Sequence, residues 1–122
     1  MPSLSRALVA TAFLLSLAGQ ASAHAHLKTA SPEVDGTVAS APKEVTATFT
    51  EKLEEKLSRL TVKNGDGRQV DKGDTHFPAG SDGRSLAVTL ESLPAGTYTV
   101  NWTAASVDTH KTTGSFTFVV RP

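Results

Sequence analysis

The sequence predicts a single all-β domain built as an antiparallel β-sandwich or barrel. Apolar residues recur at every second position in several short segments, and after residue 23 no segment keeps a helical period over about a dozen residues. Gly, Pro, Asn and Asp separate these segments at spacings of roughly 8 to 12 residues, which is typical of sandwiches and barrels. Each segment would therefore bury one face of a sheet.

The clearest strand candidate is "EVTATFT" (44–50), in which three apolar residues alternate with threonines. Further strands with the same period-two pattern are predicted at 85–90, 97–104 and 115–120. Residues 57–64 are another candidate strand, and 26–29 is a weaker one. Three connecting segments have other patterns. Residues 31–36 predict a turn, "EKLEEKLS" (51–58) predicts one helical turn, and the polar stretch 65–84 predicts a hairpin followed by an exposed loop.

Residues 1–23 have the three-part layout of a secretory signal peptide. One arginine precedes the apolar run 7–19, and Ala21-Ser22-Ala23 provides the small-x-small exit. The apolar run is shorter than the about 20 residues that a membrane-spanning helix needs. We therefore expect cleavage after Ala23 and an exported β-domain at 24–122 with no stable membrane insertion. His24 would then carry both a free α-amine and an imidazole.

Composition excludes several classes of function. The chain has 12 Lys plus Arg against 12 Asp plus Glu, and no basic run is interleaved with aromatic residues, so we expect no nucleic-acid partner. Cysteine is absent, which excludes disulfides and thiolate metal sites. The only methionine is Met1, so the mature chain also lacks thioether ligands for a soft metal ion.

Histidines supply the candidate metal ligands. His24 offers its amine and Nδ1 to one ion, and the pair Asp108-x-His110 offers a carboxylate and a second imidazole. Three nitrogens and one oxygen suit the tetragonal preference of Cu(II), whereas Zn(II) favours a tetrahedral site and Fe(II) a facial one. His76 lies in a polar loop, where we expect an ordinary surface residue.

A second arrangement lies within "HAH" (24–26) itself. The amine, two deprotonated backbone amides and the imidazole of His26 could wrap Cu(II) in a square plane. This amide-wrapped mode needs a flexible terminus, and it fails if the chain near Leu27 is paired in a sheet.

Three stretches together resemble the CopC family of periplasmic copper-binding, copper-resistance proteins. They are "HAHLKTASPEVDG", "ATFTEKLEEKLS" and "PAGTYTVNWTAASVDTHKTTGSFTFVV". The resemblance implies an immunoglobulin- or cupredoxin-like Greek-key fold and Cu(II) held by a histidine brace, in which a terminal histidine chelates through its amine and ring. It places His24, Asp108 and His110 at the metal, and Glu51 in at most an outer role. It also implies a CopD-type inner-membrane copper transporter as partner.

We therefore expect a non-enzymatic periplasmic Cu(II) carrier or buffer in copper homeostasis or resistance. Because some family members have a methionine-rich Cu(I) loop that this sequence lacks, a Cu(II)-only type is expected. A histidine brace also forms the site of lytic polysaccharide monooxygenases, so a copper-dependent oxidative enzyme is the alternative. Few aromatic residues and a carboxylate where oxygen would bind count against it. A metal-free secreted β-sandwich module is the third hypothesis.

Overall fold

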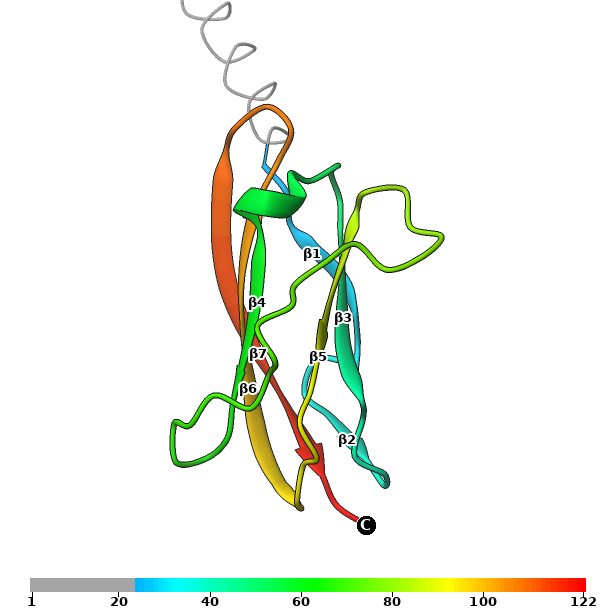
Figure 1. Cartoon of the computed structure of the whole chain (residues 1–122), viewed down its shortest axis with the longest axis vertical. Coiled ribbons are helices and arrows are strands. Elements are labelled where there is room, and N and C mark those ends of the chain that lie inside the picture. The colour runs from blue at the N-terminus through cyan, green and yellow to red at the C-terminus, as the bar shows by residue number, and fades with distance from the viewer. Residues whose placement is uncertain (1–23) are drawn as a thin grey trace, which may run out of the picture.

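The structure, a computed structural model, describes residues 24–122 of the chain (Figure 1). These residues contain seven strands, which form two sheets. The strands are β1 (Leu27–Ser31), β2 (Gly36–Val38), β3 (Glu44–Phe49), β4 (Arg59–Lys63), β5 (Ser85–Thr89), β6 (Gly96–Ala105) and β7 (Lys111–Val120). One sheet has the order β1-β3-β5 and the other the order β2-β7-β6-β4. The predicted signal peptide lies outside the described residues.

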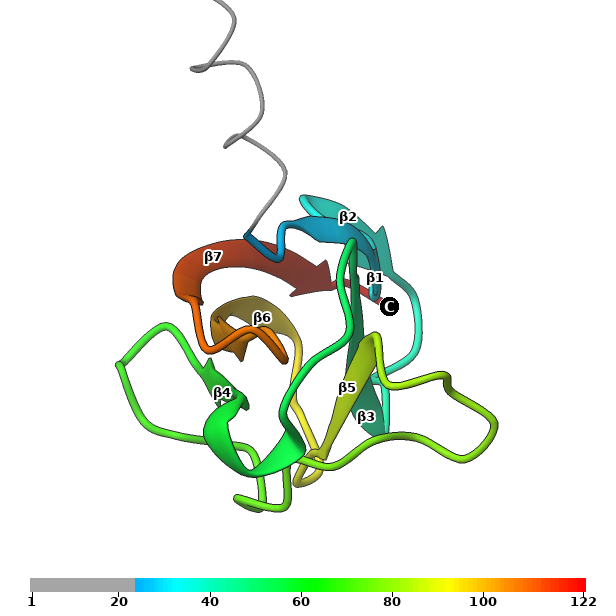
Figure 2. The same ribbon diagram turned by 90° about the horizontal axis from the view of Figure 1, so that it is seen from above.

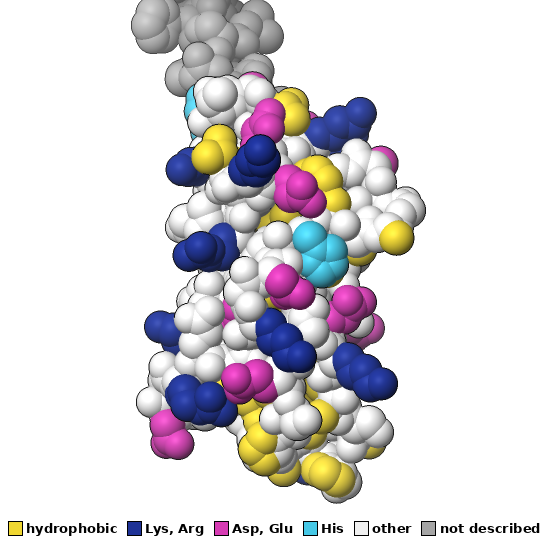
Figure 3. All heavy atoms as spheres, in the orientation of Figure 1, with side chains coloured by type: hydrophobic (Ala, Val, Ile, Leu, Met, Phe, Trp, Pro, Cys, Tyr) yellow, Lys and Arg dark blue, Asp and Glu magenta, His cyan; other side chains and the backbone are white. Residues whose placement is uncertain are grey.

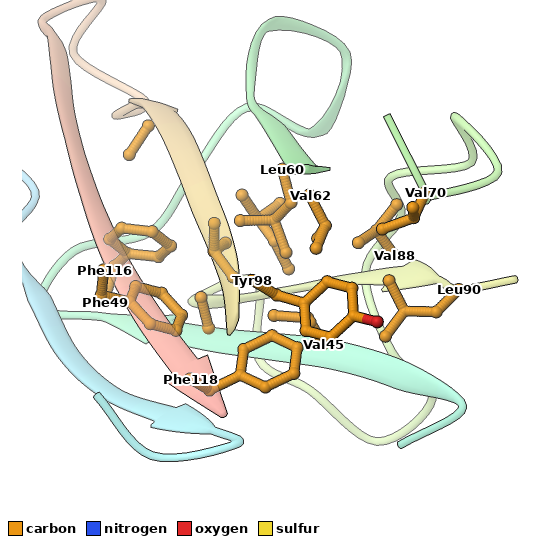
Figure 4. Close-up of a cluster of buried hydrophobic side chains, with 14 of the residues drawn as sticks. Val45, Phe49, Leu60, Val62, Val70, Val88, Leu90, Tyr98, Phe116 and Phe118 are labelled. Atoms are coloured by element: carbon orange, nitrogen blue, oxygen red, sulfur yellow. The ribbon is translucent and has the colours of Figure 1, made fainter. Parts of the chain in front are cut away.

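The two sheets pack face to face because their strands alternate apolar and polar side chains. Along β3, Val45, Ala47 and Phe49 are at most 1% exposed, while the threonines between them are only partly buried. Figure 4 shows the resulting core, in which side chains from both sheets meet. The labelled members are Val45, Phe49, Leu60, Val62, Val70, Val88, Leu90, Tyr98, Phe116 and Phe118. The prediction of an all-β sandwich is confirmed, with two open sheets rather than a closed barrel.

One strand departs from the predicted antiparallel arrangement. β2 begins at Gly36, the end of the predicted turn, and pairs in parallel with residues 118–120 of β7. Three residues are too few to show a period in the sequence. Only the distant partner strand therefore defines β2.

β7 begins four residues earlier than predicted, at Lys111, and passes through Gly114. The register places Gly114 opposite Trp102, and a Cβ built on Gly114 would lie 2.4 Å from Cζ2 of Trp102. The indole ring therefore covers the glycine and packs edge-on against Phe49, with ring centroids 5.1 Å apart. Glycine in this strand marks a close approach of another group, as is common for strand-interior glycine.

The two remaining predicted connections agree with the structure in part. A 3-10 turn, η2 (Glu55–Leu57), occupies part of the predicted helical turn. After β4 the chain folds back in a short turn closed by the isolated Lys63–Gln69 bridge, and the rest of 65–84 crosses to the other sheet. The loop is less exposed than predicted, because Val70 and Asp71 are buried. Isolated bridges tie that loop to the strands, including His76 to Ala87. Within residues 24–122 no helix has the length and apolar character needed to cross a bilayer.

Candidate metal centre

The first described residues are fixed to both sheets at one end of the sandwich. Ala25 is fully buried in the core, and its carbonyl accepts a 2.7 Å hydrogen bond from the Thr112 hydroxyl of β7. The His26 amide donates to the Thr50 hydroxyl at 2.9 Å, and the Thr50 amide donates to the His26 carbonyl at 2.9 Å. His24 directly precedes these two anchored residues, so the fold sets where its side chain can lie.

The β6–β7 connection, residues 106–110, forms a tight loop at the same end (Figures 1 and 2). The Ser106 amide donates to the His110 carbonyl, and the Thr109 amide donates to the Ser106 carbonyl, both at 2.9 Å. Thr109 has a φ of 74°, in the left-handed region that β-branched residues seldom adopt. Such backbone strain persists only where surrounding contacts fix it. The loop therefore presents Asp108 and His110 in one defined shape.

The structure brings His24 and His110 together. Their ring centroids lie 4.8 Å apart and the ring planes are nearly perpendicular, at 84°. Nδ1 of His24 is buried and has no hydrogen-bond partner among the described residues. A buried polar atom without a partner is costly, and such an atom in a native fold calls for a water molecule or an ion beside it.

Asp108 contacts His110 through one carboxylate oxygen, Oδ1. Oδ1 accepts hydrogen bonds from the Ser106 hydroxyl and from the His110 amide (3.4 Å), and it lies 3.3 Å from Nδ1 of His110. The Ser106 hydroxyl, helped by the His110 amide and ring, holds the pKa of Asp108 below its ordinary value. The carboxylate is therefore ionised at neutral pH. Within residues 24–122, no hydrogen bond or ion pair occupies its second oxygen, Oδ2.

The other candidates lie apart from this contact set. His26 has an exposed side chain and a backbone that is bonded to Thr50, and Nδ1 of His76 contacts the carbonyl of Asp74 at 2.7 Å. Glu51 is half-buried, and in the described part of the chain it makes no hydrogen bond or ion pair with the histidines. Sequence reasoning missed Ser106 and Thr112, because a hydroxyl residue gives no signal of its distant partner.

The side chains at this end fit a metal ion of intermediate softness. Two imidazoles and one carboxylate suit Cu(II) or Zn(II), and thioether or thiolate ligands are absent from the sequence after Met1. Among residues 24–122, no three His, Cys, Asp or Glu side chains already converge on a single point. The side chains thus form a histidine pair with an adjacent carboxylate, and any further donor must come from elsewhere.

Charged side chains of both signs are mixed on one face of the molecule. Figure 3 shows Lys and Arg side chains interspersed with Asp and Glu over the face drawn, in keeping with 12 residues of each sign in the sequence. A nucleic-acid interface would need a concentrated basic stripe.

Known proteins are similar to this chain in both sequence and fold. The family model for the CopC domain matches residues 27–121. Copper resistance protein C of Escherichia coli is 36% identical over 132 residues, covering 99% of this chain and all of that protein.

Two solved structures are similar. CopC from Methylosinus trichosporium OB3b superposes with a TM-score of 0.75 at 30% identity, over 81% of this chain and 95% of that one. PcoC, a methionine-rich copper resistance protein from Escherichia coli, gives a TM-score of 0.67 at 35% identity, over 81% of this chain and 100% of that one.

Proposed function

The chain belongs to the CopC family of non-enzymatic copper-binding proteins, and we propose that it carries or buffers Cu(II) in the periplasm. The ion is the cargo, and a histidine brace at the amino terminus of the mature chain holds it. His24, His110 and Asp108 are the proposed ligands. The proposal includes removal of residues 1–23, because only then does His24 have a free amine.

The observation that carries this proposal is the buried Nδ1 of His24, which lacks a hydrogen-bond partner within residues 24–122 and lies beside the ring of His110. A folded protein rarely leaves such a nitrogen without a partner, because its desolvation is not repaid. The amine of a mature His24 would lie on the same residue as Nδ1, so both can bind one ion. His110 then supplies the second imidazole.

Asp108 adds negative charge next to the two imidazoles. Its Oδ1 orients His110, and its Oδ2 is left to contact the cation, so one carboxylate can act both on the ligand and on the ion. Partners that orient a ligating histidine also raise its basicity. The lowered pKa of Asp108 keeps this charge in place well below neutral pH.

The donor set favours Cu(II) over Cu(I). Residues 24–122 contain no methionine or cysteine, and Cu(I) prefers such soft sulfur ligands. The similar PcoC, in contrast, is a methionine-rich protein. We propose that this chain binds only the oxidised ion. By the same family relation, a CopD-type membrane transporter is the proposed partner in copper transfer.

The test is a Cu(II) titration, against a competing chelator, of protein whose mass confirms His24 as the first residue. The matched variant carries one extra glycine before His24, which turns the amine into an amide and leaves every side chain unchanged. We expect the extension to remove most of the affinity, because the chelate ring is lost. Equal affinity of the two proteins would refute the brace.

A further inference from the structure

Building on the proposed function, we propose that Thr50 and Thr112 select the way in which the amino terminus binds Cu(II). The residues His24-Ala25-His26 could hold copper in either of two ways. In the brace, His24 acts together with His110. In the amide-wrapped mode, the amine, two backbone amides and the His26 ring surround the ion. We call Thr50 and Thr112 the threonine clamp, because they hold the segment in a form that the second mode cannot use.

Thr112 forms the first half of the clamp. Its hydroxyl donates to the carbonyl of Ala25 at 2.7 Å, across 87 positions of sequence, and also lies 3.5 Å from the carbonyl of Ala104. Thr112 follows His110 by two residues on the strand that leaves the metal loop. One hydroxyl therefore links the terminal segment to the strand that positions the second histidine.

Thr50 forms the second half and directly follows β3 of the other sheet. Its hydroxyl accepts the His26 amide, and its own amide donates to the His26 carbonyl, both at 2.9 Å. Thr50 is held in turn by Nη1 of Arg84, which donates to the Thr50 carbonyl at 2.7 Å. Both backbone groups of His26 are thus occupied by a residue that is itself anchored.

These contacts oppose the amide-wrapped mode directly. That mode needs the His26 amide to lose its proton and to face the ion, whereas here the amide proton is donated to Thr50. It also requires residues 24–26 to curl around one centre, which would pull the fully buried side chain of Ala25 out of the core. The brace needs neither change, because its donors are the two imidazoles and the His24 amine, and the rings of His24 and His110 already lie with centroids 4.8 Å apart.

The clamp therefore acts as a set of positioning residues that do not touch the ion. It orders the terminus before copper arrives, which lowers the entropy cost of binding. It also discriminates between two modes available to the same tripeptide. A neutral hydrogen bond of ordinary strength shifts such an equilibrium by about three- to tenfold, so removal of both halves is expected to shift it by about ten- to a hundredfold.

The experiment uses the processed protein in four forms: wild type, Thr50→Val, Thr112→Val and the double variant. Valine keeps the shape of threonine and removes the hydroxyl. Thr113→Val is the matched control, because Thr113 is the exposed neighbour on the same strand. Thr112→Ser keeps a hydroxyl at this position, so its copper-binding mode is expected to match that of wild type.

Two readouts are compared. In the metal-free protein, hydrogen exchange of the His26 amide should become about three- to tenfold faster in Thr50→Val and remain unchanged in Thr113→Val. With one equivalent of Cu(II), electron paramagnetic resonance should change from a His110-dependent spectrum in wild type to a four-nitrogen spectrum in the double variant. Adding His26→Ala to the double variant should abolish the four-nitrogen species.

The outcomes separate the clamp from the brace. If the double variant keeps the wild-type spectrum and its dependence on His110, the clamp proposal is overturned while the brace stands. If wild type itself binds through His26 and is indifferent to His110, the brace fails and the clamp fails with it. Thr50 is exposed, so Thr50→Val alone serves if the double variant does not fold, and an unchanged exchange rate of the His26 amide then overturns the clamp.

Discussion

Replacing Gly114 with alanine should destabilise the domain, although glycine is normally a poor strand residue. A Cβ at Gly114 would lie 2.4 Å from Cζ2, 2.6 Å from Cε2 and 3.0 Å from Nε1 of Trp102. These atoms belong to a rigid bicyclic ring, so the whole indole must move rather than one flexible tip. The ring also packs edge-on against Phe49, and that aromatic contact would be lost or distorted.

The expected loss of stability is the sum of one stabilising effect and two destabilising effects. Alanine in place of a strand glycine gains about 0.5 to 1 kcal/mol in conformational terms. Overpacking costs about 1 to 3 kcal/mol, and loss of an aromatic pair costs about 0.5 to 1.5 kcal/mol. The net loss is about 2 kcal/mol, which for a domain of this size lowers the thermal midpoint by roughly 8 to 16 °C.

Thermal unfolding by circular dichroism measures this change, and fluorescence of Trp102, the only tryptophan in the chain, reports the displaced ring. We expect red-shifted emission in Gly114→Ala. Gly65→Ala is the matched control, because nothing lies within 4 Å of a Cβ built there. Adding Trp102→Leu to Gly114→Ala should recover part of the lost stability. An alanine variant as stable as wild type, with unchanged emission, would refute the packing argument.

Four further predictions concern ionisation. Burial raises the pKa of Tyr98, whose hydroxyl donates to the Pro94 carbonyl, so its stabilising contribution should be complete below the ordinary value near ~10 and be lost as pH rises through the folded-state pKa. Tyr98→Phe should therefore flatten the alkaline limb of the stability curve measured by denaturant unfolding. Ser106→Ala should raise the pKa of Asp108 towards its ordinary value in a carboxyl NMR titration, and an unchanged pKa would contradict the role of that hydroxyl. In wild type, the stability that Asp108 contributes should be present above pH ~4 and be lost as pH falls through its lowered pKa. Finally, Cu(II) affinity should fall steadily from about pH 8 to about pH 5, because protons compete for imidazole and amine nitrogens; a flat profile in a chelator competition would exclude these donors.

Strands whose inner face is continuously apolar could be predicted from the sequence. β3 is an example, since burial of Val45, Ala47 and Phe49 imposes the period of two. The first four residues of β7, Lys111 to Gly114, could not be predicted, because polar side chains and a glycine hide their strand character. Their pairing with β6 and the covering ring of Trp102 define them. β2 was missed for the same reason, since its three residues depend on a strand far along the chain.

The candidate ligands could be proposed from residue types, but their supports could not. A terminal histidine and an Asp-x-His pair offer recognisable donors, and the structure places His24 beside His110. Ser106 and Thr112, in contrast, look like ordinary residues of a β-protein. Their hydrogen bonds depend on contacts made only in the folded chain, so their roles follow from the structure alone.

The most direct test of the proposed copper site compares His110→Ala with His26→Ala in processed protein. Cu(II) affinity is measured against a competing chelator, and electron paramagnetic resonance counts the nitrogen ligands. The brace predicts that His110→Ala weakens binding strongly and removes one nitrogen, while His26→Ala changes neither quantity. Loss of tight binding in His26→Ala, with His110→Ala unaffected, would contradict the site and assign copper to residues 24–26 alone.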